Sequence, residues 1–198
     1  MISQHQGTPA EIIVYYQNPV ALLEPSDLVA MSKEKVILVQ VTSAELFSQA
    51  HIPGAVLVTP QELVCGIPPA SGKLPALADL EVLFTRIGYQ PDCKIIAFDD
   101  EGGGWAGRFL WTLDIIGHYN WAYLDGGLHA WHEAGLELAK GACSANGLTP
   151  ISLDINTAPI AEISDVMATL EDSKQVVWDV RSREEYVGMR SGSQRAGH

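Results

Sequence analysis

Short apolar runs alternate along the chain with segments in which apolar residues recur at helical spacing. The apolar runs are VILVQV at 36–41, GAVLV at 54–58, KIIAF at 94–98 and NWAYL at 120–124. Their length and their branched and aromatic residues predict buried strands. The helical segments are PALADLEVLFTRIG at 75–88, RFLWTLDIIG at 108–117 and LHAWHEAG at 128–135, each ended by glycine. This alternation predicts an α/β fold with a mainly parallel sheet.

An internal repeat suggests how the chain is organised. The segment VILVQVTSAELF at 36–47 is similar to QVVWDVRSREEY at 175–186, at an offset of 139 residues. The matched pairs include Val41 with Val180, Ser43 with Ser182, Glu45 with Glu184 and Phe47 with Tyr186. Chance similarity between two strand-and-helix units is the alternative. We interpret the pattern as one complete domain at 20–140, a linker at 141–159, and the beginning of an incomplete second copy at 160–198.

The second copy is predicted to contain a helix, a strand at Val176–Val180 and a short helical start. About 40 residues cannot bury enough apolar surface to fold alone. A strand rich in valine and tryptophan also exposes edges that require partners. We therefore expect this strand to pack on the first domain or to pair with another copy of the chain, which makes self-association a further expectation.

A glycine-rich turn follows the strand KIIAF. Gly102, Gly104 and Gly107 form a literal G-x-G-x-x-G, which in dinucleotide-binding proteins lets the backbone approach a pyrophosphate. Here the three acidic residues of 99–101 lie between the strand and the glycines and would repel that anion. A tight turn from strand to helix is the better interpretation, so no dinucleotide is predicted.

Charge and cysteine content exclude several other classes. The formal net charge of −12 argues against nucleic acid or an anionic membrane as a partner, and no stretch approaches the roughly 20 apolar residues of a membrane span. Cys65, Cys93 and Cys143 lack the C-x-x-C spacing and the neighbouring histidines of a zinc site, and three unpaired thiols suit a reducing compartment. We expect a soluble, cytoplasmic protein with no metal and no cofactor.

Several motifs together resemble the rhodanese domain. They are the segment VTSAELF at 41–47 before HIPGA at 51–55, the acidic glycine-rich loop DDEGGGWAGRFLW, and the DGG-x-x-x-W pattern of DGGLHAW at 125–131. The similarity is to two-domain bacterial thiosulfate sulfurtransferases, with 20–140 resembling the first domain. It implies a three-layer α/β fold, with a central mainly parallel sheet and helices on both faces.

The resemblance also implies where the chemistry lies. In this family an active domain carries a nucleophilic cysteine in the loop after this strand, and Asp99 occupies the matching position here. The first domain is therefore expected to be catalytically silent. A cysteine of the second domain would take sulfur from a small anion such as thiosulfate and pass it to a thiophilic acceptor. None of the three cysteines follows a strand and opens a helix, so the chain alone is expected to be inactive. The alternative is a non-catalytic module that binds a partner or a small anion.

Two further residues match family positions. Arg181 corresponds to an arginine that helps bind the anionic substrate, and Trp105 to an aromatic residue that faces the active site. A solvated surface arginine and a packing tryptophan are the structural alternatives. Arg183, Arg190 and Arg195 are interpreted as surface charge. His51 and His198 share a repeat position, which favours a structural role for both.

Overall fold

The computed structural model describes residues 22–31, 35–142 and 149–190. The chain divides into two compact units, Met1–Asn156 and Thr157–His198, which are described separately. Within the described ranges no helix is long and apolar enough to cross a membrane.

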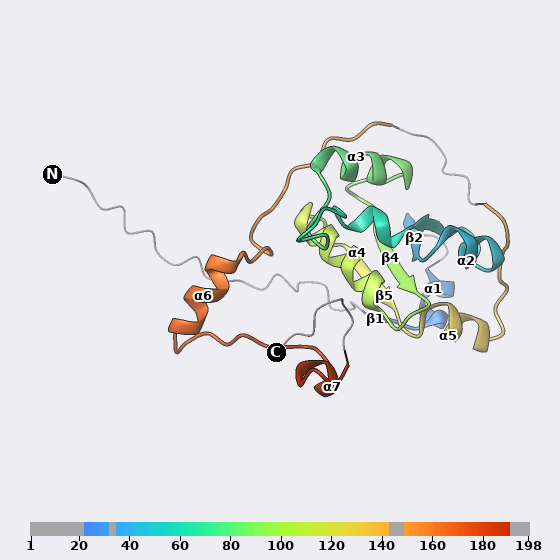
Figure 1. Cartoon of the computed structure of the whole chain (residues 1–198). Helices are drawn as coiled ribbons and strands as arrows, with labels where there is room; N and C mark the ends of the chain where they lie inside the picture. Colours follow the sequence, from blue (N-terminus) through green and yellow to red (C-terminus); the bar gives the residue numbers. More distant parts are fainter. Residues whose placement is uncertain (1–21, 32–34, 143–148, 191–198) are drawn as a thin grey trace. The chain divides into compact units, whose positions relative to one another are not determined.

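The first unit is built on a parallel sheet, which confirms the predicted α/β class (Figure 1). Its strands are β1 (Leu22–Leu23), β2 (Val36–Val41), β3 (Val56–Val58), β4 (Lys94–Asp99) and β5 (Trp121–Leu124). They lie in the order β1-β5-β4-β2-β3, and every neighbouring pair is parallel. Because all strands run the same way, their carboxyl ends share one edge, where the loops after β4 and β5 lie.

Helices cover both faces of this sheet. They are α1 (Pro25–Ala30), α2 (Ala44–Gln49), the 3-10 helix η1 (Pro60–Leu63), α3 (Leu77–Arg86), α4 (Gly104–Ile115) and α5 (Gly127–Glu133). One core cluster joins α3 and α4 to one face, through side chains such as Val39 and Ile95; the other joins α1, α2 and α5 to the opposite face, through Leu38 and Ile96. Alternate residues of β2, β3, β4 and β5 thus supply both cores.

Helix α3 illustrates how the sequence pattern produces this packing. Leu80, Leu83 and Phe84 recur at helical spacing, and all three are buried. Burying each large apolar side chain contributes roughly 1.5–3 kcal/mol. Gly88, just past the helix, has a φ of +75° and ends it as the sequence predicts.

Residues 151–156, placed by the sequence in a linker, belong to the first unit, where Ile151 and Leu153 contact α3. The amide of Ile151 donates to Thr85 Oγ1 (3.3 Å), and the amide of Leu153 donates to Glu81 Oε1 (3.1 Å). Leu153 itself is buried in the α3–α4 core. The first unit therefore includes chain that follows α5, while the predicted domain boundaries stay a prediction.

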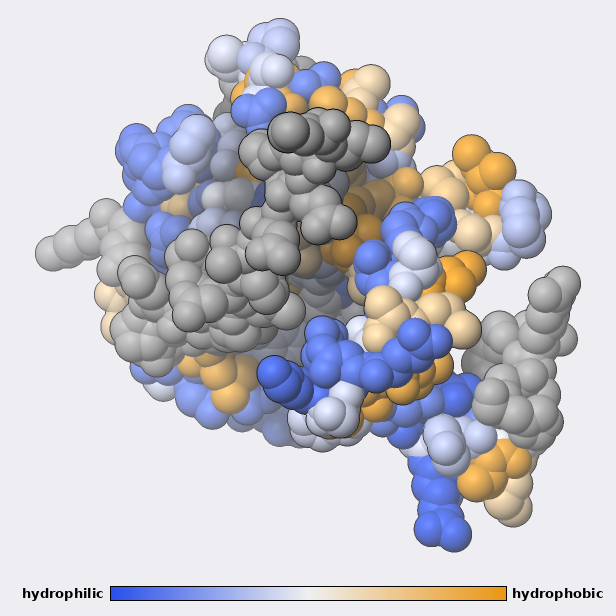
Figure 2. All heavy atoms as spheres, turned by 90° about the vertical axis from the view of Figure 1, so that its left-hand side faces the viewer, coloured by the Kyte–Doolittle hydropathy of each residue, from blue (hydrophilic) through white to orange (hydrophobic). Residues whose placement is uncertain are grey.

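The second unit contains α6 (Ile163–Glu171) and α7 (Arg183–Tyr186), close to the helical segments that the sequence predicts. The predicted strand at Val176–Val180 is wrong for the single chain, since residues 174–180 form no strand. Val176, Trp178 and Val180 are 87%, 85% and 87% exposed. Their counterpart β2 has a strand on each side, and without such neighbours an extended segment has no ladder to join. Figure 2 colours each described residue by its hydropathy, with hydrophobic residues in orange.

The exposed segment at 176–180 leads to a test of self-association. In dilute protein its amides should exchange hydrogen about as fast as an unstructured peptide, because no ladder protects them. At high protein concentration the exchange of these amides should become slower if copies of the chain pair through this segment. Hydrogen exchange measured over a hundredfold dilution, with β2 as the protected reference, checks this. Fast exchange at every concentration would contradict pairing.

A second prediction concerns His118, which is buried between Tyr89 and Asn120. Its Nε2 donates to the Asn120 carbonyl (3.1 Å), so the Tyr89 hydroxyl faces Nδ1 (3.3 Å). Burial lowers the pKa of His118 below its usual value of 6.5. The unfolded chain therefore binds a proton before the native chain does, so the free energy of unfolding falls as pH drops below about 6.5.

The variant His118→Gln, which cannot titrate, should show a shallower loss of stability between about pH 7 and pH 5. Urea unfolding across this pH range is the measurement. His129→Gln is the matched control, because the His129 side chain is exposed. A slope for His118→Gln equal to that of the wild type would refute the assignment.

Candidate functional site

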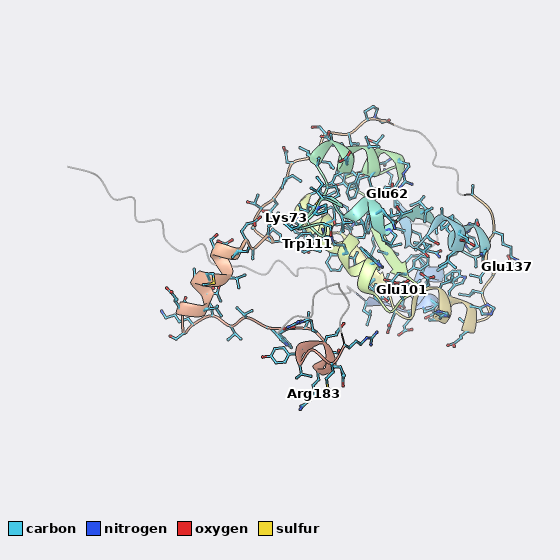
Figure 3. The ribbon with its side chains drawn as sticks, viewed as in Figure 1. Glu62, Lys73, Glu101, Trp111, Glu137 and Arg183 are labelled. Atoms are coloured by element: carbon cyan, nitrogen blue, oxygen red, sulfur yellow. The ribbon has the colours of Figure 1, made fainter. Side chains whose placement is uncertain are left out.

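The site predicted from the sequence is the loop between β4 and α4, and its centre is the carboxylate of Asp99. Asp99 is the last residue of β4 and is only 2% exposed. Its Oδ1 accepts hydrogen bonds from the amides of Glu101 (3.1 Å) and Gly103 (2.7 Å). Its Oδ2 accepts from the amides of Trp105 and Ala106, both at 3.0 Å. Figure 3 labels Glu101 in this loop.

The glycines explain how four N–H groups come to point at one carboxylate. Gly103, the N-cap of α4, has a φ of +95°, in the left-handed region that other residues rarely adopt. Successive amides of such a turn face inward and form a concave cradle for an anion. The first amides of α4 lack partners within the helix and complete that cradle. The carboxylate therefore receives four hydrogen bonds of the charge-assisted kind.

The loop after β5 packs closely against this cradle. A Cβ atom added to Gly127 would lie 2.3 Å from the backbone oxygen of Asp99, and the φ of Gly127 is +52°. On the other side, a Cβ added to Gly103 would lie 3.1 Å from the Tyr123 hydroxyl. Burial, and then the charges of Asp99 and Asp125, raise the pKa of Tyr123. The DGG turn is thus fitted to the Asp99 loop by direct contact.

This geometry separates the glycines that the turn needs from those that it does not. Gly104 and Gly107 lie in α4 without positive φ, and a Cβ on either would meet nothing within 4 Å. Of the three glycines in the literal G-x-G-x-x-G, only Gly102, with a φ of +87°, is left-handed, and the other left-handed glycine of the turn, Gly103, is not one of the three. The N–H groups that a pyrophosphate would require are already bonded to Asp99, which agrees with the interpretation of the motif as a structural turn.

The predicted role of Trp105 stays untested, but its contacts are defined. Its amide donates to Asp99, and its half-buried side chain packs against the α3–α4 core. Trp105 therefore helps to hold the start of α4 in place.

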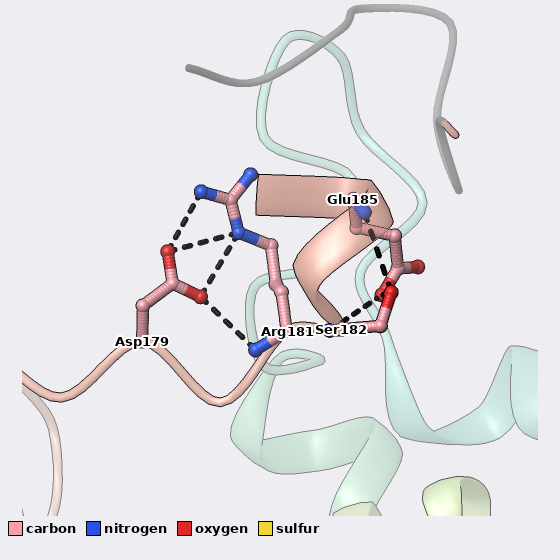
Figure 4. Close-up of polar contacts among 4 residues, drawn as sticks. All are labelled: Asp179, Arg181, Ser182 and Glu185. Atoms are coloured by element: carbon pink, nitrogen blue, oxygen red, sulfur yellow. Dashed lines mark hydrogen bonds and ion pairs between the residues drawn. The ribbon is translucent and has the colours of Figure 1, made fainter. Parts of the chain in front are cut away.

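Arg181 lies in the second unit, where its guanidinium binds Asp179 (Figure 4). Nη2 lies 2.7 Å from Asp179 Oδ2, and Nε donates to both carboxylate oxygens at 3.0 Å. These hydrogen bonds lower the pKa of Asp179 and raise that of Arg181. The guanidinium also lies over the Tyr186 ring, with 5.6 Å between Arg181 Cζ and the ring centroid. An anionic substrate would have to compete with Asp179 for this cation.

The repeat pairing of Ser43 with Ser182 has a structural counterpart. Ser43 Oγ accepts from the amide three residues later (3.2 Å) at the start of α2, and Ser182 Oγ does the same (3.3 Å) at the start of α7. Both serines are thus N-caps of short helices that begin inside the repeated segment. The local similarity is real, while the incomplete second copy stays a prediction.

The two described cysteines lie apart from the cradle. Cys93 is buried just before β4, and burial raises the pKa of its thiol. Cys65 lies in the connection after η1, where its thiol donates to the carbonyls of Ala70 (3.4 Å) and Ser71 (3.6 Å). Cys143, Arg195 and His198 lie outside the described residues. Among the residues that are described, no three His, Cys, Asp or Glu side chains are grouped as a metal site requires.

Both arginines of the first unit bind protein groups. Arg86 donates to the Leu57 carbonyl and pairs with Glu62 Oε1 (2.6 Å). Arg108 donates to the carbonyls of Leu63 and Gly72, at 3.1 and 2.8 Å. The positive charge of both guanidinium groups is thus used to hold the segments around η1.

His51, from the HIPGA motif, makes contacts of a structural kind. Its ring stacks on Phe47 at 4.1 Å, and its Nδ1 donates to the Phe47 carbonyl at 2.9 Å. Its backbone exchanges two hydrogen bonds with Ala139, which joins the turn before β3 to the chain after α5.

Residues 24–134 match the model of the rhodanese-like domain. An anion cradle after a central parallel strand, the HIPGA turn and the DGG turn lie within that range. The chain belongs to the rhodanese-like family.

Relatives and solved structures agree with this assignment. The chain is 42% identical over 178 residues to the thiosulfate sulfurtransferase of Pseudomonas aeruginosa, and 39% identical over 178 residues to that of Azotobacter vinelandii. Each match covers 89% of this chain and 65% of the relative, so the chain spans about two thirds of their length. The crystal structure of SseA from Escherichia coli, titled as a 3-mercaptopyruvate sulfotransferase, shares the fold with a TM-score of 0.79 at 20% identity. That match covers 90% of this chain and 72% of SseA.

The contact between the two loops gives a pair of opposite predictions. Gly127→Ala should destabilise the protein by about 2–4 kcal/mol, because the new Cβ meets the Asp99 carbonyl and the residue keeps a left-handed φ. Gly107→Ala should stabilise it by about 0.5–1 kcal/mol, because alanine is the better helix former and has open space there. Urea unfolding measures both. Equal effects of the two substitutions would show that the loops do not touch as described.

Proposed function

We propose that this chain is part of a sulfurtransferase of the thiosulfate type, in which the first rhodanese domain performs no chemistry. The similarity to two bacterial thiosulfate sulfurtransferases supports the class of reaction. The observation that carries the silent role is the buried Asp99 carboxylate at the centre of the loop. A carboxylate cannot accept a sulfane sulfur as a thiolate does.

In this proposal, sulfur transfer belongs to a cysteine in the loop of the second domain. That thiolate would attack the outer sulfur of thiosulfate, release sulfite and carry the sulfur as a persulfide to a thiophilic acceptor. Arg181 is proposed to bind the anionic donor, because a guanidinium matches the oxygens of such an anion. Trp105 is proposed to face that active site.

The described cysteines support the expectation that the chain alone is inactive. The Cys93 thiol is buried and its pKa is raised, both of which suppress the thiolate. Cys65 follows η1, and its thiol is held by two carbonyls rather than by N–H groups. Neither thiol lies at the start of a helix after a strand.

The second candidate is a non-catalytic rhodanese-like module. The Asp99 loop favours it, because a cradle already filled by a carboxylate has no use in catalysis. The two candidates differ in the protein as it occurs in the cell. Native protein that forms thiocyanate and contains a persulfide would support the enzyme, whereas inactive native protein would support the module.

The 198-residue chain itself should form no more thiocyanate from thiosulfate and cyanide than a protein-free blank. The reason is that Asp99 stands where the family has its nucleophile, and neither described cysteine has the surroundings of one. The measurement is colorimetric detection of thiocyanate as its iron complex. Activity well above the blank that is lost in Cys65→Ser, Cys93→Ser or Cys143→Ser would contradict the proposal.

A further inference from the structure

The N–H cradle after β4 has the form of an oxyanion site with both oxygen positions occupied. Each oxygen of Asp99 accepts two backbone N–H groups, one pair from the turn and one from the first residues of α4. Two oxygens with two donors each is also how one edge of a sulfate or thiosulfate ion would be bound.

We propose that Asp99 is a built-in ligand of this cradle, which holds the loop in its anion-bound shape and excludes external oxyanions. Both roles of Asp99 depend only on the shape of the loop and on what occupies it, and neither depends on whether the protein transfers sulfur.

Burial of the carboxylate supports this role. A charged group that is only 2% exposed is costly unless it is fully hydrogen-bonded, and here four donors compensate its lost hydration. Removing the carboxylate would leave those four N–H groups without an acceptor at the end of a buried strand. The loop would then lose its shape unless it took up an external anion.

Tethering explains why the internal ligand prevails over external ones. A carboxylate fixed to the strand that leads into the loop is always present at the cradle, with an effective concentration of at least roughly millimolar, and loses no translational freedom when it binds. External anions are also repelled by the adjacent carboxylates of Asp100 and Glu101 and by the net charge of −12. The cradle is therefore closed to anions in the native chain.

The test compares Asp99→Ala with Asp100→Ala, which removes a neighbouring carboxylate that accepts none of these four hydrogen bonds. Melting temperatures are measured from 0 to about 10 mM sodium sulfate, with sodium chloride keeping the ionic strength constant. Sulfate also stabilises proteins in general, so the wild type measures that background.

Asp99→Ala should melt below both the wild type and Asp100→Ala, and sulfate should raise its melting temperature saturably. The wild type and Asp100→Ala should share one small, non-saturating response. The proposal is overturned if Asp99→Ala melts like Asp100→Ala without sulfate, or if its response to sulfate equals that of the wild type.

If Asp99→Ala does not fold at any sulfate concentration, a second variant tests whether the Asp99 carboxylate is the ligand of the cradle. In Asp99→Asn one oxygen becomes an NH₂ group, which cannot accept a hydrogen bond. At least two of the four amides, those of Glu101, Gly103, Trp105 and Ala106, should then exchange hydrogen roughly tenfold faster than in the wild type. Wild-type protection of all four amides would overturn the proposal.

Discussion

The amides at the start of α4 need an acceptor, and the buried carboxylate of Asp99 supplies it. Because its two oxygens bind four N–H groups, the end of β4, the glycine turn and the first turn of α4 form one hydrogen-bonded unit. The DGG turn is fitted against the same unit through Gly127, which leaves no space for a side chain. The edge of the sheet after β4 is therefore filled by the protein itself.

The two compact units differ in whether their apolar strands have neighbours. In the first unit, β2 lies between β3 and β4, and its side chains alternate between two cores. In the second unit the matching segment has the same apolar character but no strand beside it, and its valines and tryptophan are exposed. The same kind of sequence thus gives a strand in one place and an extended exposed segment in the other, because pairing decides the outcome.

The contrast explains which predictions from the sequence were successful. KIIAF, NWAYL and the segment 75–88 were predicted correctly, because local pattern and local burial agree in them. The strand at Val176–Val180 was predicted wrongly, since its formation depends on partners that the pattern cannot show. The two-residue β1 and the short α1 were missed because they are too brief to show a period.

At the site, the sequence indicates an acid in place of a nucleophile. It does not reveal that the carboxylate binds four amides. It also does not reveal that Tyr123 and Gly127 enclose the loop, although the two glycines of the DGG motif indicate a tight turn at that place.

The strand order has a consequence for the order in which the protein is made. Leu22 in β1 pairs with Tyr123 in β5, although the two lie 101 positions apart in the chain. During synthesis β1, the first strand among the described residues, therefore cannot take its place until β5 has emerged, and β5 in turn needs β4. During synthesis, the amino-terminal segment has to remain unpaired while most of the domain is translated. A strand without its partner exposes backbone N–H and C=O groups, so β1 is open to non-native pairing until β5 has emerged.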